Sequence, residues 1–87
     1  MTEIKKMIQE GKLDDAIQLL LLKIENNNND DEPYYLLGNA YRKKGDWQQA
    51  VNNYLEAISR NPESPAVNAR QMIMDILNFY NKDMFNQ

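Results

Sequence analysis

The chain has 87 residues and a net charge of −3, with neither cysteine nor histidine. This length predicts one small domain, and the missing residue types exclude disulfides and the usual zinc sites. The negative charge argues against general nucleic-acid binding, and the longest apolar run, Leu19 to Leu22, is too short to span a bilayer. We expect no metal, cofactor, nucleic-acid or membrane partner, and the lack of cysteine fits a cytoplasmic location.

The first half of the chain predicts two helices followed by a polar loop. The first helix spans roughly Thr2 to Glu10, and the second runs from about Leu13 to Glu25. The asparagine- and aspartate-rich run at 26–31 forms the loop. Pro33 then suits the first turn of a third helix, since proline at that position gives up no needed hydrogen bond.

Glycine and proline divide the second half. Gly45 supplies a left-handed end to the third helix, and Asp46 with Gln49 resembles a capping box that opens a fourth. Asn61-Pro62 ends the fourth helix, and Ser64-Pro65 opens a fifth. We expect the fifth helix to end at or shortly after Asn81, with a frayed tail at 83–87.

Small and aromatic residues follow a fixed spacing on both sides of Gly45. Gly38 and Ala50 give the third and fourth helices a point of close approach, and large residues fill the space around it. The pattern is an aromatic, two residues, Leu-Gly, two residues, Tyr, then Ala, three residues, an aromatic, and Pro. Its positions are Tyr34, Leu37, Gly38, Tyr41, Ala50, Tyr54 and Pro62.

This pattern resembles the tetratricopeptide repeat. The resemblance implies an all-α fold of about five antiparallel helices in helix-turn-helix repeats. A shift of 34 residues places Gly45 on Gly11 and Ala50 on Ala16, a second and weaker match. We expect a truncated repeat at 1–28, a complete repeat at 31–64, a capping helix at 65–82 and the tail at 83–87.

No arrangement of residues predicts catalysis. Neighbouring carboxylates such as Asp14 and Asp15 point about 100° apart on a helix and do not share a site. Three glycines do not form a phosphate loop. The basic residues are sparse and offset by acids. We therefore expect a protein without enzymatic activity.

Two positions depart from the complete repeat in the second helix. Leu19 and Leu22 occupy slots that hold Asn53 and Glu56 one repeat later. Either the first repeat buries these leucines locally, or they form an exposed apolar strip that meets another chain.

The resemblance also places a concave groove on the third and fifth helices. Its slots are polar in the third helix and apolar in the fifth, while the fifth helix is polar where the complete repeat has Tyr34 and Tyr41. That polar side fits a solvated terminal cap. We expect Val67 and Met74 to pack on the preceding repeat. The predicted partner-binding residues are Tyr35, Asn39, Arg42, Ala69, Ile73, Ile76, Leu77 and Tyr80.

Two hypotheses for function follow. In the first, the chain self-associates, most simply as a homodimer, because its fifth helix carries more apolar surface than one neighbour can cover. In the second, the groove binds an amphipathic or acidic segment of another protein, with Arg42 and Lys5 providing charge. The carboxylate clamp of chaperone-binding family members is incomplete, because its lysine slot beside Asn39 holds Tyr35.

Overall fold

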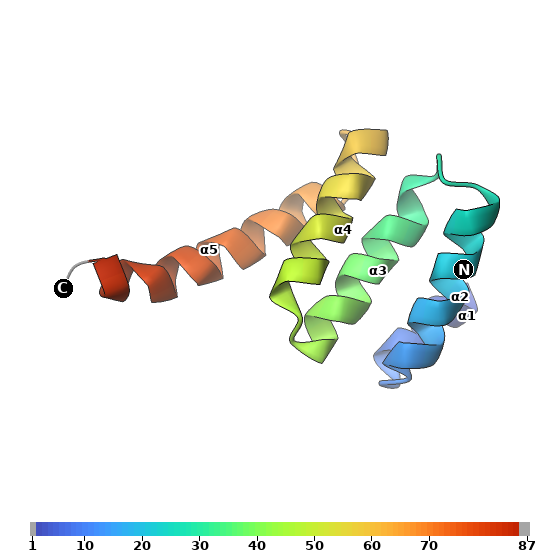
Figure 1. Cartoon of the computed structure of the whole chain (residues 1–87), viewed down its shortest axis with the longest axis horizontal. Helices are drawn as coiled ribbons and strands as arrows, with labels where there is room; N and C mark the ends of the chain where they lie inside the picture. The colour runs from blue at the N-terminus through green and yellow to red at the C-terminus, as the bar shows by residue number, and fades with distance from the viewer. Residues whose placement is uncertain (1, 86–87) are drawn as a thin grey trace.

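The computed structural model is helical throughout, with no strand among the residues that it describes, which are 2–85 for the backbone and 2–79 for the side chains. Figure 1 shows successive helices running in opposite directions across an elongated molecule of 47 × 28 × 17 Å. Within the described residues, no helix is long and apolar enough to cross a membrane. The predicted all-α fold is confirmed. The helices are α1 (Thr2–Gln9), α2 (Leu13–Asn26), α3 (Asp31–Lys44), α4 (Trp47–Arg60) and α5 (Ala66–Phe85).

The two interhelical turns at glycine are built alike. Gly11 has φ 85° and Gly45 has φ 84°, a left-handed backbone that glycine adopts without strain. After α3, the Gly45 N–H donates to the Arg42 carbonyl and the Asp46 N–H to the Tyr41 carbonyl. The same pair of bonds follows α1, so both helices end in a Schellman motif, 34 positions apart.

Side-chain caps start the last three helices. The Glu32 N–H donates to the Asp30 carboxylate and the Gln49 N–H to the Asp46 carboxylate, both at 3.1 Å. At the start of α5, Ser64 Oγ accepts from the Ala66 N–H at 3.1 Å. Each cap satisfies one N–H that has no carbonyl partner within the helix. The three predicted starts are correct.

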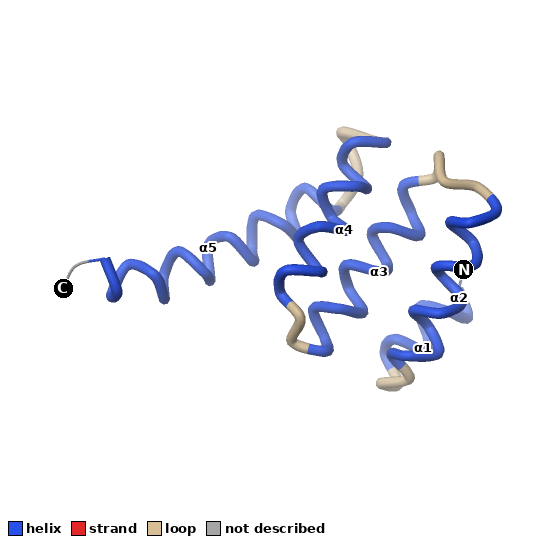
Figure 2. Tube along the Cα trace, in the orientation of Figure 1, coloured by secondary structure: helices blue, strands red, loops and turns tan. Residues whose placement is uncertain are grey.

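The end of α5 differs from the prediction. The helix continues past Asn81 to Phe85, so residues 83–85 are helical where we expected a tail. No glycine or proline follows Pro65 in the sequence, and asparagine alone did not stop the helix. The rest of that predicted tail, residues 86–87, lies outside the described part of the chain. In Figures 1 and 2 the second half of α5 extends away from the other helices.

The core consists of two apolar clusters joined at α3. The first lies between α1, α2 and α3, and the second between α4 and the first half of α5. Tyr35 and Tyr41 pack against both clusters. Helices α3 and α4 approach closely at Gly38, since a Cβ added there would lie 2.3 Å from the Tyr54 ring.

Arg60 fastens the loop after α2 to the end of α4. Its guanidinium lies 4.0 Å from the centre of the Tyr34 ring and donates to the Tyr34 hydroxyl and the Asn28 carbonyl. Glu56, one turn earlier, holds Arg60 in an ion pair of 2.7 Å. Tyr34, the aromatic at the first position of the repeat, thus helps Arg60 to hold the loop between α2 and α3.

Candidate functional site

A hollow of about 380 Å³ lies between α1 and α3. Its lining includes Tyr35, Asn39 and Arg42, which are spaced four and three residues apart and so share one side of α3. Lys5 of α1 lines the same hollow. The structure thus brings together the polar half of the predicted groove. A smaller hollow of about 130 Å³ also includes Lys5 and Tyr35 and reaches Pro65, just before α5 begins.

Tyr54 holds Asn39, a role that was not predicted from the sequence. The Tyr54 hydroxyl donates to Asn39 Oδ1 at 2.5 Å, and the Tyr35 and Tyr54 rings lie 6.0 Å apart. This hydrogen bond from α4 therefore fixes the orientation of the Asn39 side chain and leaves its amide N–H groups for other acceptors. The signal in the sequence was the aromatic at position 54, four residues after Ala50.

Burial raises the pKa of the Tyr54 phenol from 10.0 to about 12, although the positive charge of Arg42 opposes the rise. A raised folded-state pKa means that the neutral phenol contributes stability below pH 10 and that this contribution is lost as the pH rises toward 12. We expect the free energy of unfolding to fall over this range, and the fall to be smaller in Tyr54→Phe. Denaturant unfolding of both proteins at several pH values measures the difference. Because both proteins keep the other four tyrosines, the difference between them reports Tyr54 alone. If the free energy of unfolding changed with pH in the same way in both proteins, the raised pKa of Tyr54 would be contradicted.

Two of the three basic residues at the end of α3 make polar contacts with α1 and α2. Lys43 Nζ donates to the Ile8 carbonyl at 3.1 Å, which stabilises the negative end of α1. Lys44 Nζ lies 2.6 Å from the Asp14 carboxylate, and this hydrogen-bonded partner raises the pKa of the lysine. In the described residues, Arg42 and Lys5 make no such ion pair, so their charges remain available to a ligand.

Two predicted partner-binding residues of α5 lie in the core of the chain itself. Ile73 is 1% exposed and packs with Ala50, Tyr54 and Ala69, which are also buried. Ala69 and Ile73 therefore do not form an open surface, and the prediction that they bind a partner is wrong. Leu77 is partly buried against the same cluster.

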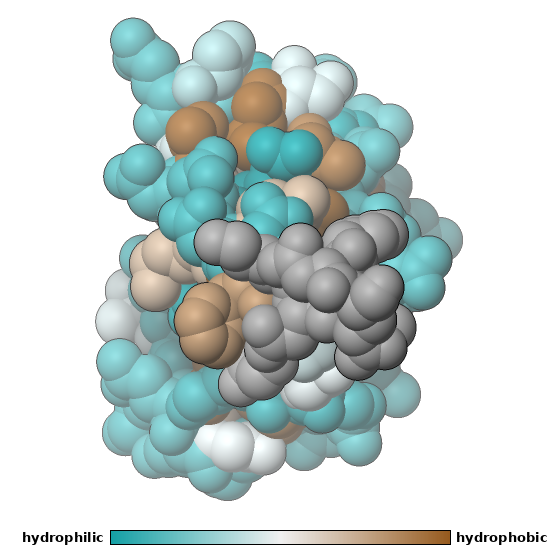
Figure 3. All heavy atoms as spheres, turned by 90° about the vertical axis from the view of Figure 1, so that its left-hand side faces the viewer, coloured by the Kyte–Doolittle hydropathy of each residue, from teal (hydrophilic) through white to brown (hydrophobic). Residues whose placement is uncertain are grey.

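Another side of α5 is exposed. Met72 is 57% exposed, Ile76 43% and Phe79 70%. Their spacing of four and three residues puts them on one side of the helix. Figure 3 looks onto this end of the molecule, where brown apolar side chains reach the surface. The side chain of Tyr80, the remaining predicted residue, lies outside the described part. Val67, expected to pack inward, is 42% exposed.

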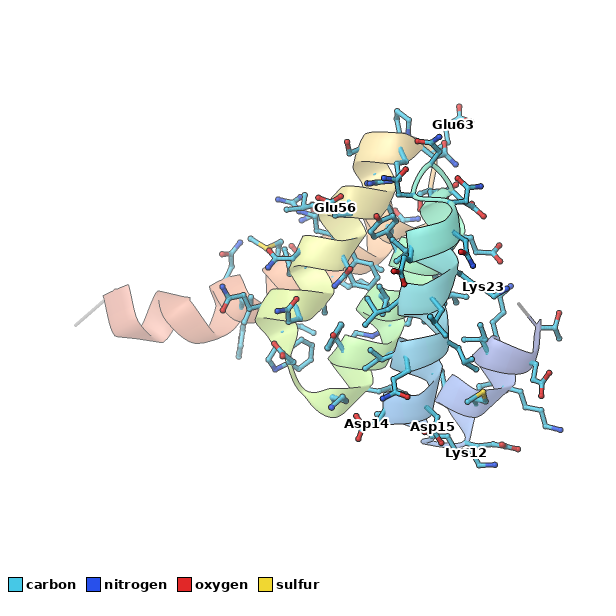
Figure 4. All side chains as sticks on the ribbon, turned by 45° about the vertical axis from the view of Figure 1, so that its right-hand side comes forward. Lys12, Asp14, Asp15, Lys23, Glu56 and Glu63 are labelled. Carbon is cyan, nitrogen blue, oxygen red and sulfur yellow. The ribbon has the colours of Figure 1, made fainter. Side chains whose placement is uncertain are left out.

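The second apolar surface lies on α2. Leu19 is 42% exposed and Leu22 is 55% exposed, so local burial, the first of the two interpretations, is wrong. Both leucines line a hollow of about 330 Å³ whose apolar lining also includes Ile4 of α1. Lys23 and Glu3 supply charge at the same hollow. Figure 4 shows Lys23 on α2 beside α1.

Two comparisons with known proteins identify the family. A sequence model described as tetratricopeptide repeat matches residues 32–64. The solution NMR structure of protein BF1650 from Bacteroides fragilis is 56% identical, over 99% of this chain and 88% of that chain, with a TM-score of 0.87. This chain is a tetratricopeptide-repeat protein. No curated protein matches its sequence.

The matched segment contains the parts of the repeat that the structure explains. Gly38, Tyr54 and Gly45 form the close approach, the ring that fills it and the turn. A tetratricopeptide repeat indicates a protein–protein interaction module. Among the described residues, no group of three metal-ligating side chains comes together. Three described surfaces of this tetratricopeptide-repeat protein are hollow or carry exposed apolar side chains: the α1–α3 hollow, the exposed side of α5 and the leucine hollow on α2.

Proposed function

We propose that this protein is an interaction module that self-associates through the exposed side of α5. The observation that carries the proposal is the exposure of Met72 and Ile76 on one side of that helix. Contiguous apolar surface of this kind marks interaction sites on proteins in water. Burying it against a second copy removes it from solvent without any change of fold.

The size of the chain supports the same conclusion. A domain of 87 residues has a small core, and here that core is divided into two clusters. Among the described side chains of α5 after Ile73, none is fully buried and Leu77 packs against the second cluster, so the turns from Met74 to Phe79 add few side chains to the core of the monomer. An intermolecular contact along these turns would stabilise the folded state by mass action.

The double variant Met72→Glu with Ile76→Lys tests the proposal. Its new side chains lie four residues apart and favour the helix, and the net charge is unchanged. Burying two such apolar side chains contributes at least about 2 kcal/mol, so we expect self-association to weaken about 30-fold or more. Sedimentation equilibrium of the wild type and the variant measures this change.

The exposed polar residues of α4 provide a matched control. Gln48→Glu with Asn52→Lys is also charge-neutral, with new side chains four residues apart on another helix, and we expect it to associate like the wild type. Equal association constants for all three proteins would contradict a role for the Met72–Ile76 side.

A second candidate function is binding of an acidic segment of another protein in the α1–α3 hollow. Its support is the meeting of Lys5, Tyr35, Asn39 and Arg42 around one space. Arg42 can bind a carboxylate through two parallel hydrogen bonds, and Tyr35 offers an apolar ring beside it. An amphipathic helix or extended segment with an apolar anchor and an acidic end would fit.

Charge reversal at Arg42 tests this candidate. We expect Arg42→Glu to weaken binding of amphipathic peptides that end in a free carboxylate, and to flatten the salt dependence. The melting temperature should change little, because Arg42 is only partly buried and makes no ion pair within the described residues. Lys6→Glu, outside the hollow, is the control. Unchanged peptide binding by Arg42→Glu and by Tyr35→Ala would rule out the hollow as the binding surface.

A further inference from the structure

Apolar side chains reach the surface at both ends of this 47 Å long molecule. At one end α5 presents Met72 and Ile76, and at the other α2 presents Leu19 and Leu22. Figure 1 shows α5 projecting away from the end where α1 and α2 lie. Because the two surfaces lie at opposite ends of one folded chain, they can meet only between two copies.

The complete repeat shows which side chains the fold needs at the positions of Leu19 and Leu22. The complete repeat holds Asn53 and Glu56 where the first repeat holds Leu19 and Leu22. Glu56 is exposed and Asn53 partly so, and α4 nevertheless packs between α3 and α5. A helix in this position therefore packs into the array without apolar side chains at these slots. Leu19 and Leu22 add apolar surface that the fold of the single chain does not use.

The shapes and charges of the two surfaces correspond. The leucine surface is a hollow of about 330 Å³, whereas the α5 surface is the convex side of a projecting helix. Lys23 and Glu3 both line the hollow, and Lys23 makes no ion pair within the described residues, so its charge is open to a partner carboxylate. Asp75 lies next to Ile76 at the edge of the α5 surface and is exposed. A helix docked in the hollow would bring an apolar stripe to an apolar floor, with opposite charges at the rim.

We infer that α5 of one copy docks in the leucine hollow of the next copy, so that the copies associate head to tail. The inference rests on the proposed self-association through α5 and identifies the surface that receives it. Such a contact joins two different surfaces, so the copy at one end of the assembly keeps an unoccupied α5 and the copy at the other end keeps an unoccupied leucine hollow. Copies then continue to add in an open chain unless the rotation closes a ring.

Two variants with complementary defects test the inference. The first, Leu19→Asn with Leu22→Glu, gives the hollow the side chains of the matching slots in the complete repeat. The second, Met72→Glu with Ile76→Lys, removes the α5 surface. We expect each variant alone to be monomeric. An equimolar mixture should form a one-to-one heterodimer and grow no further, because one variant keeps an intact α5 and the other an intact hollow.

The outcomes separate the inference from the proposal on which it rests. If the Leu19→Asn, Leu22→Glu variant associates like the wild type, or if the mixture forms no heterodimer, head-to-tail docking is overturned. Self-association through α5 then still stands if the α5 variant alone is monomeric. A wild type that is monomeric at every concentration overturns both. Circular dichroism checks the folding of each variant, and Leu22→Glu alone, at the more exposed position, serves as a milder second variant.

Discussion

Gly38→Leu is expected to unfold the protein or to lower its melting temperature more than other single changes in α3. A Cβ alone at position 38 would lie 2.3 Å from one carbon of the Tyr54 ring and 2.4 Å from the next. That ring is fully buried and hydrogen-bonded to Asn39, so it has no space into which to move. Overpacking at such a site costs about 1–3 kcal/mol or more. Thermal unfolding followed by circular dichroism measures the effect.

The smaller change Gly38→Ala isolates the contact with Tyr54. On a solvent-exposed helix surface, a change from glycine to alanine stabilises the folded state by roughly 1 kcal/mol. Here we expect the opposite effect, a fall in melting temperature. Each kcal/mol corresponds to about 4–8 °C in a domain of this size. Combining Gly38→Ala with Tyr54→Leu should recover part of the loss, because the ring atoms in the way are gone. If Gly38→Ala melted at or above the wild-type temperature, the close approach of α3 and α4 would be wrong.

Ile73→Asp is expected to be the second severe change, whereas Ile76→Asp should leave the fold intact. The two residues are three positions apart on α5, yet Ile73 is buried in the second cluster and Ile76 is exposed. A carboxylate at position 73 would be buried among apolar side chains without a partner, at a cost of about 3–5 kcal/mol or more. At position 76 the same group stays in water.

Urea unfolding of the two aspartate variants under dilute conditions makes the comparison. Low protein concentration matters, since self-association would otherwise add to the stability of the wild type. Similar losses of stability in both variants would mean that the rotation of α5 about its own axis is wrong.

The fold was predictable because its determinants are local. Gly11 and Gly45 each need a left-handed backbone, and Asp30, Asp46 and Ser64 each cap the helix that follows. These signals act within a few residues, so they can be recognised in the sequence without knowledge of the tertiary contacts. The end of α5 was missed because nothing local stops that helix: neither glycine nor proline follows Pro65.

The site was only partly predictable because exposure depends on how helices are rotated against each other. The spacing of Tyr35, Asn39 and Arg42 placed them on one side of α3, and the structure brings them to one hollow. The same reasoning put Ala69 and Ile73 on an open face, but in α5 this side packs on α4 and is buried. Periodicity fixes which residues share a side of a helix and leaves open which side meets a neighbour.

The measurement that most directly tests self-association is the mass of the wild-type protein in solution. Light scattering on a size-exclusion column, over a wide range of loading concentrations, gives this mass without a label or a partner. The exposed side of α5 predicts a mass above the 10.2 kDa of one chain, rising with concentration. A mass of 10.2 kDa at every concentration would contradict self-association and leave the α1–α3 hollow as the candidate interaction surface.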